Sequence, residues 1–236
     1  MKGEHDMPII RGGENTLVKQ NDVADDKKQL LQTGAIIITT NSPWGWTPQT
    51  LAVDSAQLNP ADVLRQTWDV EDREDAEDTV ERLLAGPTRR GDDDARLARY
   101  TRSEVSALSP DESCMVDEVA ELLTGCTFGT AKLTKDQIDS VITTVAWDIE
   151  RAAFVARLAY NSGYLCQDEV WDMLERTRSL AQSHFETWRD YGISFIKGRA
   201  IVMCHSTFAD MADVWASTCL LAEPERGVWA WEPLRS

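Results

Sequence analysis

Histidine is the scarcest of the residues that commonly carry chemistry, with only three in the 236-residue chain. So few imidazoles leave little material for a zinc site, which is usually built from histidine and cysteine. The five cysteines form no CxxC pair, and their odd number argues against a disulfide framework. We therefore expect reduced thiols in the core, as is usual in a cytoplasm, and neither a metal nor a cofactor.

Basic side chains are also few, because 24 lysines and arginines stand against 40 aspartates and glutamates, a formal net charge of -16. Nucleic acids and anionic membranes both require a basic face on their protein partner, so neither is an expected partner. The longest apolar run near the N-terminus, residues 35–38, is far too short to span a bilayer. The first residues are polar and lack the apolar stretch of a signal peptide, so we expect a cytoplasmic protein.

Sequence motifs of known reactions are absent, since the chain has no HExxH, GxSxG or P-loop pattern. Cys204 and His205 are adjacent, and neighbouring side chains on a helix point about a quarter-turn apart, so nothing requires a nucleophile–base pair. The aspartates at 92–94 could hold Mg²⁺ or Ca²⁺, but their spacing is not that of an EF-hand loop. We predict no metal site and favour a protein without catalytic activity, while an enzyme remains the alternative.

What the sequence has in abundance is helical periodicity. Apolar residues recur every three or four positions, no segment alternates over a long stretch, and no internal repeat is present. Ser109 and Thr134 each begin a capping box, and Asn59 followed by Pro60 begins a further helix. We therefore predict an all-α fold, a single compact multi-helix domain of about seven to nine helices.

The domain organisation follows from local composition. Residues 1–26 are polar, contain glycine and show no period, so we expect a flexible N-terminal arm. The helical domain is predicted over 27–236. A polar connector at 89–100 divides it into a smaller front section, 27–100, and a larger back section, 101–236.

The most informative segment is the apolar stretch 145–164, the end of one long helix that we predict from Thr134 to Gly163. It sets two charges, Asp148 and Arg151, one helical turn apart, where their side chains can meet. Charges in an apolar surface are costly unless they are paired.

Two interpretations of this pair stay open. The one that we favour is a structural ion pair that fixes the register of the helix, and the other is a ligand-binding or active-site cluster. Arg157 and Arg199 are further candidates for the same network.

Eight carboxylates are concentrated in one short stretch. They are Asp69, Glu71, Asp72, Glu74, Asp75, Glu77, Asp78 and Glu81. The pattern predicts a helix over 71–85 with Ala76, Thr79, Val80 and Leu83 on its inner face. The carboxylates form either a solvated face, which the helix dipole favours near its N-terminus, or a docking surface for a basic protein.

Several segments in a fixed order resemble a bacterial family, the YbeU/YbeR-like domain of unknown function. They are 68–84, 146–151, 163–165, 184–188 with Tyr191, Gly198-Arg199, and the tail 228–231. Together they cover about residues 60–232. Asp69 stands where the family pattern has glycine, Thr187 replaces a serine, and Val228 and Ala230 replace prolines.

The resemblance implies a helical bacterial cytoplasmic domain and no established activity, so no catalytic residue can be carried over. It identifies six signature positions, interpreted as structural or as a possible ligand cluster. They are Trp147, Asp148, Arg151, Trp188, Tyr191 and Arg199.

Two functions are consistent with these observations. We favour a non-catalytic acidic module that binds a basic protein, most concretely an immunity protein that neutralises a basic toxin or effector through the eight carboxylates. Electrostatic steering would make that association fast and sensitive to salt. The alternative is an enzyme or a small-ligand-binding protein that uses Asp148, Arg151 and Arg199 in a helical cleft.

Overall fold

The computed structural model describes residues 23–41, 46–53, 58–85, 91–230 and 233–235. The regular structure in these ranges is helical apart from one two-stranded hairpin, so the predicted all-α class is confirmed. No helix in them is long and apolar enough to cross a membrane.

Eleven α-helices lie in the described residues, more than expected, because several are only one turn long. The longer ones are α5 (Arg73–Leu84), α7 (Gly91–Thr101), α8 (Pro110–Leu123), α10 (Val145–Asn161), α11 (Gln167–His184), α12 (Trp188–Val202) and α13 (Phe208–Leu221). The short ones are α2 (Asp25–Lys28), α3 (Ala35–Thr40), α4 (Pro60–Val63) and α9 (Lys135–Ser140). Most of the predicted arm lies outside the described residues, but α2 already begins inside its last two positions.

Three tighter or wider helical turns and one hairpin complete the fold. They are the 3₁₀ turns η1 (Gln29–Gln32) and η4 (Val105–Ala107), the π-helical turn η3 (Leu64–Trp68), and the antiparallel strands β1 (Thr127–Phe128) and β2 (Ala131–Lys132). The hairpin is too short to have left a pattern in the sequence.

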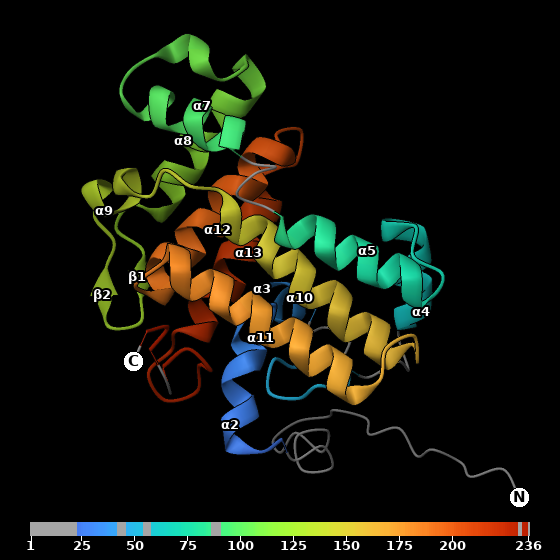
Figure 1. Ribbon diagram of the computed structural model, residues 1–236. Helices are drawn as coiled ribbons and strands as arrows, with labels where there is room; N and C mark the ends of the chain where they lie inside the picture. The colour runs from blue at the N-terminus through green and yellow to red at the C-terminus, as the bar shows by residue number, and fades with distance from the viewer. Residues whose placement is uncertain (1–22, 42–45, 54–57, 86–90, 231–232, 236) are drawn as a thin grey trace, which may run out of the picture.

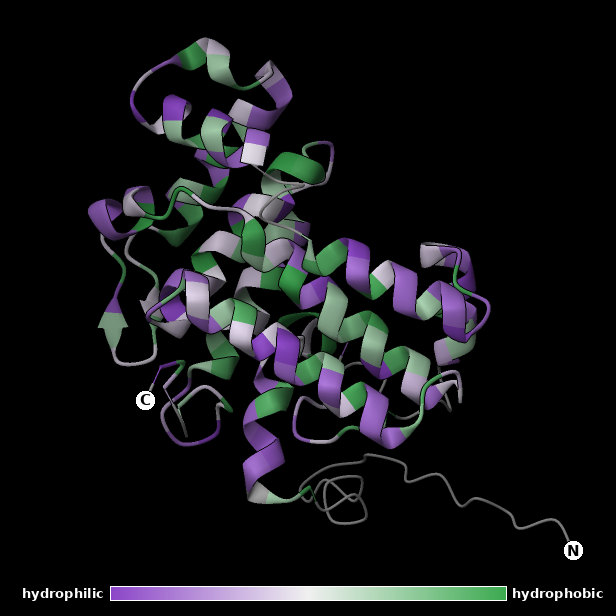
Figure 2. Ribbon diagram, in the orientation of Figure 1, coloured by the Kyte–Doolittle hydropathy of each residue, from purple (hydrophilic) through white to green (hydrophobic). Residues whose placement is uncertain are grey.

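Helix α10 is the central element, with α5 and α11 on either side of it and α12 crossing it (Figure 1). Its first half belongs to a hydrophobic cluster with α8, α12 and α13, and its second half to a cluster with α5 and α11. Only Arg151, Tyr160 and Asn161 of its residues are not buried. Figure 2 shows α5 and α11 as mixed hydrophilic and hydrophobic helices, as expected for elements that cover a buried one.

The single helix predicted over 134–163 is wrong, because residues 141–144 leave the helical conformation and separate α9 from α10. The backbone N–H of Thr144 donates to Asp94 Oδ1 at 2.6 Å. Buried Lys197 donates from Nζ to the carbonyl oxygen of Val141 at 2.7 Å. These side chains come from distant segments and provide the partners that a continuous helix would have supplied.

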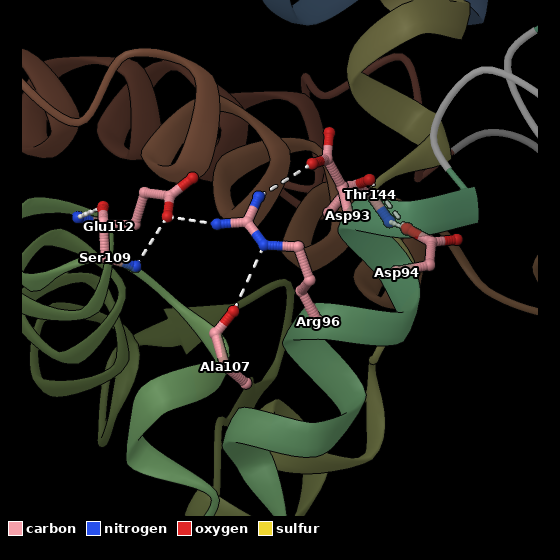
Figure 3. Close-up of polar contacts among 7 residues, drawn as sticks. All are labelled: Asp93, Asp94, Arg96, Ala107, Ser109, Glu112 and Thr144. Carbon is pink, nitrogen blue, oxygen red and sulfur yellow. Dashed lines mark hydrogen bonds and ion pairs between the residues drawn. The ribbon is translucent and has the colours of Figure 1, made fainter.

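The polar connector predicted at 89–100 is mostly helix α7, and its charges tie it to its neighbours (Figure 3). Arg96 pairs with Asp93 one turn earlier and with Glu112 of α8. Asp94 reaches the N-terminus of α10 instead. Asp93 is therefore the structural partner of a cation, and Asp94 that of a helix end.

The expectation of core thiols is wrong for two of the five cysteines. Cys114 and Cys166 are exposed, and the other three are half-buried, while all five are free. Cys114 lies beside Glu118, whose negative charge raises the pKa of the thiol. Cys166 occupies the N-cap position of α11, at the edge of the domain.

Near the C-terminus, Trp229 ties the chain to the core. Its ring stacks on Trp188 with 4.8 Å between centroids and 2° between planes, and its Nε1 donates to Gln32 O at 2.9 Å.

Candidate functional site

A cavity of about 690 Å³ lies where the segment after α3, the turn η3, α10 and α12 meet. Its aromatic and cationic lining residues, which define what we call the tryptophan cavity, are Trp46, Trp68, Trp147, Phe154, Arg151 and Arg199. Sites for small molecules typically measure roughly 300–1,000 Å³. The cavity therefore has the size of a ligand-binding site.

The wall that carries Trp68 is formed by the π-helical turn η3. This turn ends at Asp69, whose φ of 56° and ψ of 42° lie in the left-handed region that favours glycine. Val70 then donates its N–H to Leu64 O at 3.3 Å, which closes a wide turn. Isolated π turns are frequent at functional sites.

Trp46 reaches the cavity because two side chains of α10, Arg157 and Asn161, hold the segment that follows it. Arg157 is fully buried and donates from Nη2 to Thr47 O at 3.0 Å. Asn161 Oδ1 accepts the backbone N–H of Val53 at 2.9 Å. Burial lowers the pKa of Arg157 to about 9. Arg157 was a candidate for the Asp148 network, and this is wrong, because it binds backbone carbonyls on another side of α10.

Arg151 is held on several sides. Its guanidinium carbon lies 4.7 Å from the ring centroid of Trp68 and 5.2 Å from that of Trp147, distances typical of cation–π contacts. Its Nη1 donates to Asp148 Oδ1 at 3.1 Å, and Asp148 is fully buried. The predicted contact between Asp148 and Arg151 is therefore present, and it fixes the cation against the cavity wall.

Arg199, the second cation of the cavity, has no carboxylate at ion-pair distance in the described ranges. It follows Gly198, where a Cβ atom would lie 2.6 Å from Trp147 Cβ and 2.9 Å from Thr144 O, so glycine is what allows α12 to approach α10. The guanidinium carbon lies 5.6 Å from the Trp147 ring centroid. Within the described ranges, Arg199 forms no ion pair and its Nε has no hydrogen-bond partner. Burial lowers the pKa of Arg199, and the charge of Asp210 only partly offsets this.

The cavity is thus more positive than the rest of the molecule. Among its described lining residues the two guanidinium groups face a single carboxylate, Asp62, which pairs with Arg65 at 2.5 Å. The Nε1 groups of Trp68 and Trp147 are buried and, in the described part of the chain, lack acceptors. A buried donor without an acceptor costs about 1–3 kcal/mol.

Trp188 and Tyr191 lie outside the cavity, so the six signature positions do not form one cluster. Both rings pack on Trp229 in the core. Tyr191 donates its hydroxyl to Glu150 Oε1 at 2.9 Å, and Glu150 also accepts N–H groups at the start of α3, including that of Gly34 at 3.0 Å. Burial raises the pKa of Glu150 to about 7.

Glu150 is a residue that the sequence analysis missed. The available sign was a carboxylate in the middle of a helix that is otherwise largely apolar, where an unpaired charge is costly. Glu150 has a structural role and does not line the cavity. It accepts N–H groups at the start of α3, and this helix positions the cavity residues Ile37 and Asn41.

The eight carboxylates of the predicted docking surface, here named the acidic face, divide into two groups. Four have partners within the protein. Asp72 accepts the N–H of Asp75, and Asp75 accepts that of Glu71. Glu77 pairs with Arg73, and Glu81 pairs with Arg176 of α11. The other four, Asp69, Glu71, Glu74 and Asp78, are exposed, and none has an ion pair in the described ranges.

The cavity offers aromatic rings, two guanidinium groups and one carboxylate to a bound molecule. Its described lining contains no histidine, cysteine or serine. In the described part of the chain no group of three or more histidine, cysteine, aspartate or glutamate side chains could hold a metal ion.

Fold and site together define a helical domain built around one buried helix, with an aromatic, cationic cavity at its side. The chain belongs to the family described as Protein of unknown function (DUF1266), whose model matches residues 63–233. That range includes Trp68, Trp147, Arg151 and Arg199, whereas Trp46 precedes it. No curated protein and no solved structure matches the chain.

Proposed function

We propose that this protein binds a small molecule in the tryptophan cavity and does not transform it. The observation that carries the proposal is the convergence of four aromatic side chains and two guanidinium groups, from segments far apart in the sequence, around about 690 Å³. Pockets with apolar and aromatic walls and a few placed polar groups are the usual form of a ligand site.

The composition of the cavity supports binding over catalysis. General acid–base catalysis needs a titratable group with a suitable pKa near the reacting atoms, and covalent catalysis needs an activated nucleophile. Asp62 is the single carboxylate of the described lining, and it is already paired with Arg65.

A flat, neutral probe tests the site without involving its charges. We expect 2-naphthamide to bind the wild-type protein in isothermal titration calorimetry, because the aromatic walls offer it apolar contact. Trp68→Ala removes one wall and should weaken binding at least tenfold, which corresponds to about 1.4 kcal/mol. Trp171→Ala is the matched control, since Trp171 is a buried tryptophan of α11 outside the cavity. Equal binding by both variants would refute the site.

A separate observation favours a second function, the binding of a basic protein. Asp69, Glu71, Glu74 and Asp78 are exposed and have no ion pair in the described ranges, in a chain of net charge -16. We propose that these carboxylates contact such a partner, in the manner of an immunity protein that neutralises a toxin. As part of this proposal, we group the chain with the YbeU/YbeR-like proteins and place it in the bacterial cytoplasm.

Affinity capture from the native host tests this second function. The wild-type protein should retain a basic protein at about 50 mM salt and release it at about 500 mM, because screening shortens the reach of exposed charges. Converting the four carboxylates to their amides should abolish retention. Amides at the exposed Asp111, Asp136, Glu223 and Glu225 change the net charge equally and should not.

A further inference from the structure

Resting on the small-molecule site proposed above, we infer that the natural ligand is a monoanion. It has a flat, apolar body and one singly charged group, such as a carboxylate, which Arg199 binds. The inference comes from the different surroundings of the two guanidinium groups in the tryptophan cavity.

Arg199 is the cation that still requires a partner. It is partly buried, forms no ion pair in the described ranges, and its Nε lacks an acceptor. A desolvated charge is unfavourable unless an opposite charge and hydrogen-bond acceptors compensate it. A carboxylate fits this requirement well, because its two oxygens match the planar guanidinium in a bidentate contact.

The charge of Arg151 is already paired within the protein. Asp148 balances its charge at 3.1 Å, and the rings of Trp68 and Trp147 occupy its faces at 4.7 and 5.2 Å. A second anionic group of a ligand would therefore meet a neutralised cation. It would also meet Asp62, the carboxylate of the lining.

The net charge of the whole molecule also favours a ligand with a single negative charge. At a net charge of -16 the protein repels anions at long range, and the repulsion grows with the charge of the ligand. Polyphosphate sites generally combine several backbone N–H donors with cations, as in a P-loop, and the sequence has no such motif. One guanidinium that has no ion pair in the described ranges, beside a second one that is already paired, is suited to a single negative charge.

Three probes with the same ring system test the inference by isothermal titration calorimetry. They are neutral 2-naphthamide, singly charged 2-naphthoate and doubly charged 2,6-naphthalenedicarboxylate. We expect 2-naphthoate to bind about tenfold tighter than 2-naphthamide, as is typical of a charge-assisted hydrogen bond. The dicarboxylate should bind no tighter than 2-naphthoate.

Variants at Arg199 test whether this residue causes the preference for 2-naphthoate over 2-naphthamide. Arg199→Met should abolish the preference for 2-naphthoate over 2-naphthamide. Arg199→Lys should retain part of the preference, because it keeps the charge and loses the planar fork. Arg99→Met removes the same charge from the exposed surface of α7 and should change nothing. Cooperative thermal unfolding of each variant shows that it is folded.

The outcomes separate this inference from the proposed function. If 2-naphthamide and 2-naphthoate bind the wild-type protein equally, or if Arg199→Met keeps the preference, the monoanion is wrong while the ligand site stands. Tighter binding of the dicarboxylate would also overturn the monoanion. If none of the probes binds, the proposed ligand site is itself wrong.

Discussion

The tryptophan cavity and the acidic face are adjacent in the sequence, at Trp68 and Asp69, yet their charged side chains have opposite surroundings. On the acidic face, carboxylates stand in water, where solvent and salt screen them and each contributes little. In the cavity, Arg199 is partly buried beside aromatic rings, where an opposite charge has a large effect. The number of charges in a sequence therefore says less about function than the burial of a few of them.

Glu150 gives the sharpest test of this contrast, because its carboxylate is fully buried whereas most of those on the acidic face are exposed. Its pKa is raised by burial from 4.5 to about 7. A raised folded-state pKa means that the stability from this group is fully present below pH 4.5 and is lost as the pH rises through 7. We expect the wild-type protein to lose roughly 3 kcal/mol of unfolding free energy from this group over that range.

Urea unfolding between pH 5 and pH 8 measures the effect. Glu150→Gln removes the ionisable group and should flatten this part of the pH dependence. Glu74→Gln, which changes an exposed carboxylate of α5, should preserve it. If Glu150→Gln and the wild-type protein show the same slope, the buried carboxylate does not govern stability in this range.

Gly198 tests the close contact that positions Arg199. A Cβ atom at this position would lie 2.6 Å from Trp147 Cβ, so Gly198→Ala should separate α12 from α10 and destabilise the fold by about 2 kcal/mol. Gly91→Ala is the control, because no atom lies within 4 Å of a Cβ atom there. Urea unfolding should show a lower midpoint for the first variant alone, and equal midpoints would contradict the packing.

Elements with strong periodicity were predictable from the sequence. The inner face of α5 was predicted residue by residue, as Ala76, Thr79, Val80 and Leu83, and all four are buried. The capping boxes at Ser109 and Thr134 were also found, since both are local patterns. The break between α9 and α10 was missed because it depends on Asp94 and Lys197, which approach from other helices.

The candidate site could be predicted only in part, for a similar reason. The contact between Asp148 and Arg151 follows from helical spacing alone. Grouping Tyr191 with Arg199 was wrong because eight residues of α-helix advance about 12 Å, which places the two side chains in different parts of the core. The sequence did not predict that Trp46 lines the cavity, since its place depends on the buried Arg157.

The smallest expected effect concerns the ion pair between Glu81 and Arg176, where the acidic face meets α11. The two side chains bond through both Glu81 oxygens, at 2.5 and 2.8 Å, and the pair lowers the pKa of Glu81. Both side chains are about half exposed, however, so solvent screens the attraction. We expect Glu81→Gln to change the unfolding free energy by less than about 1 kcal/mol, and less again at high salt. A loss comparable to that of Gly198→Ala would show that the acidic face contributes to the fold, and the contrast with the tryptophan cavity would then fail.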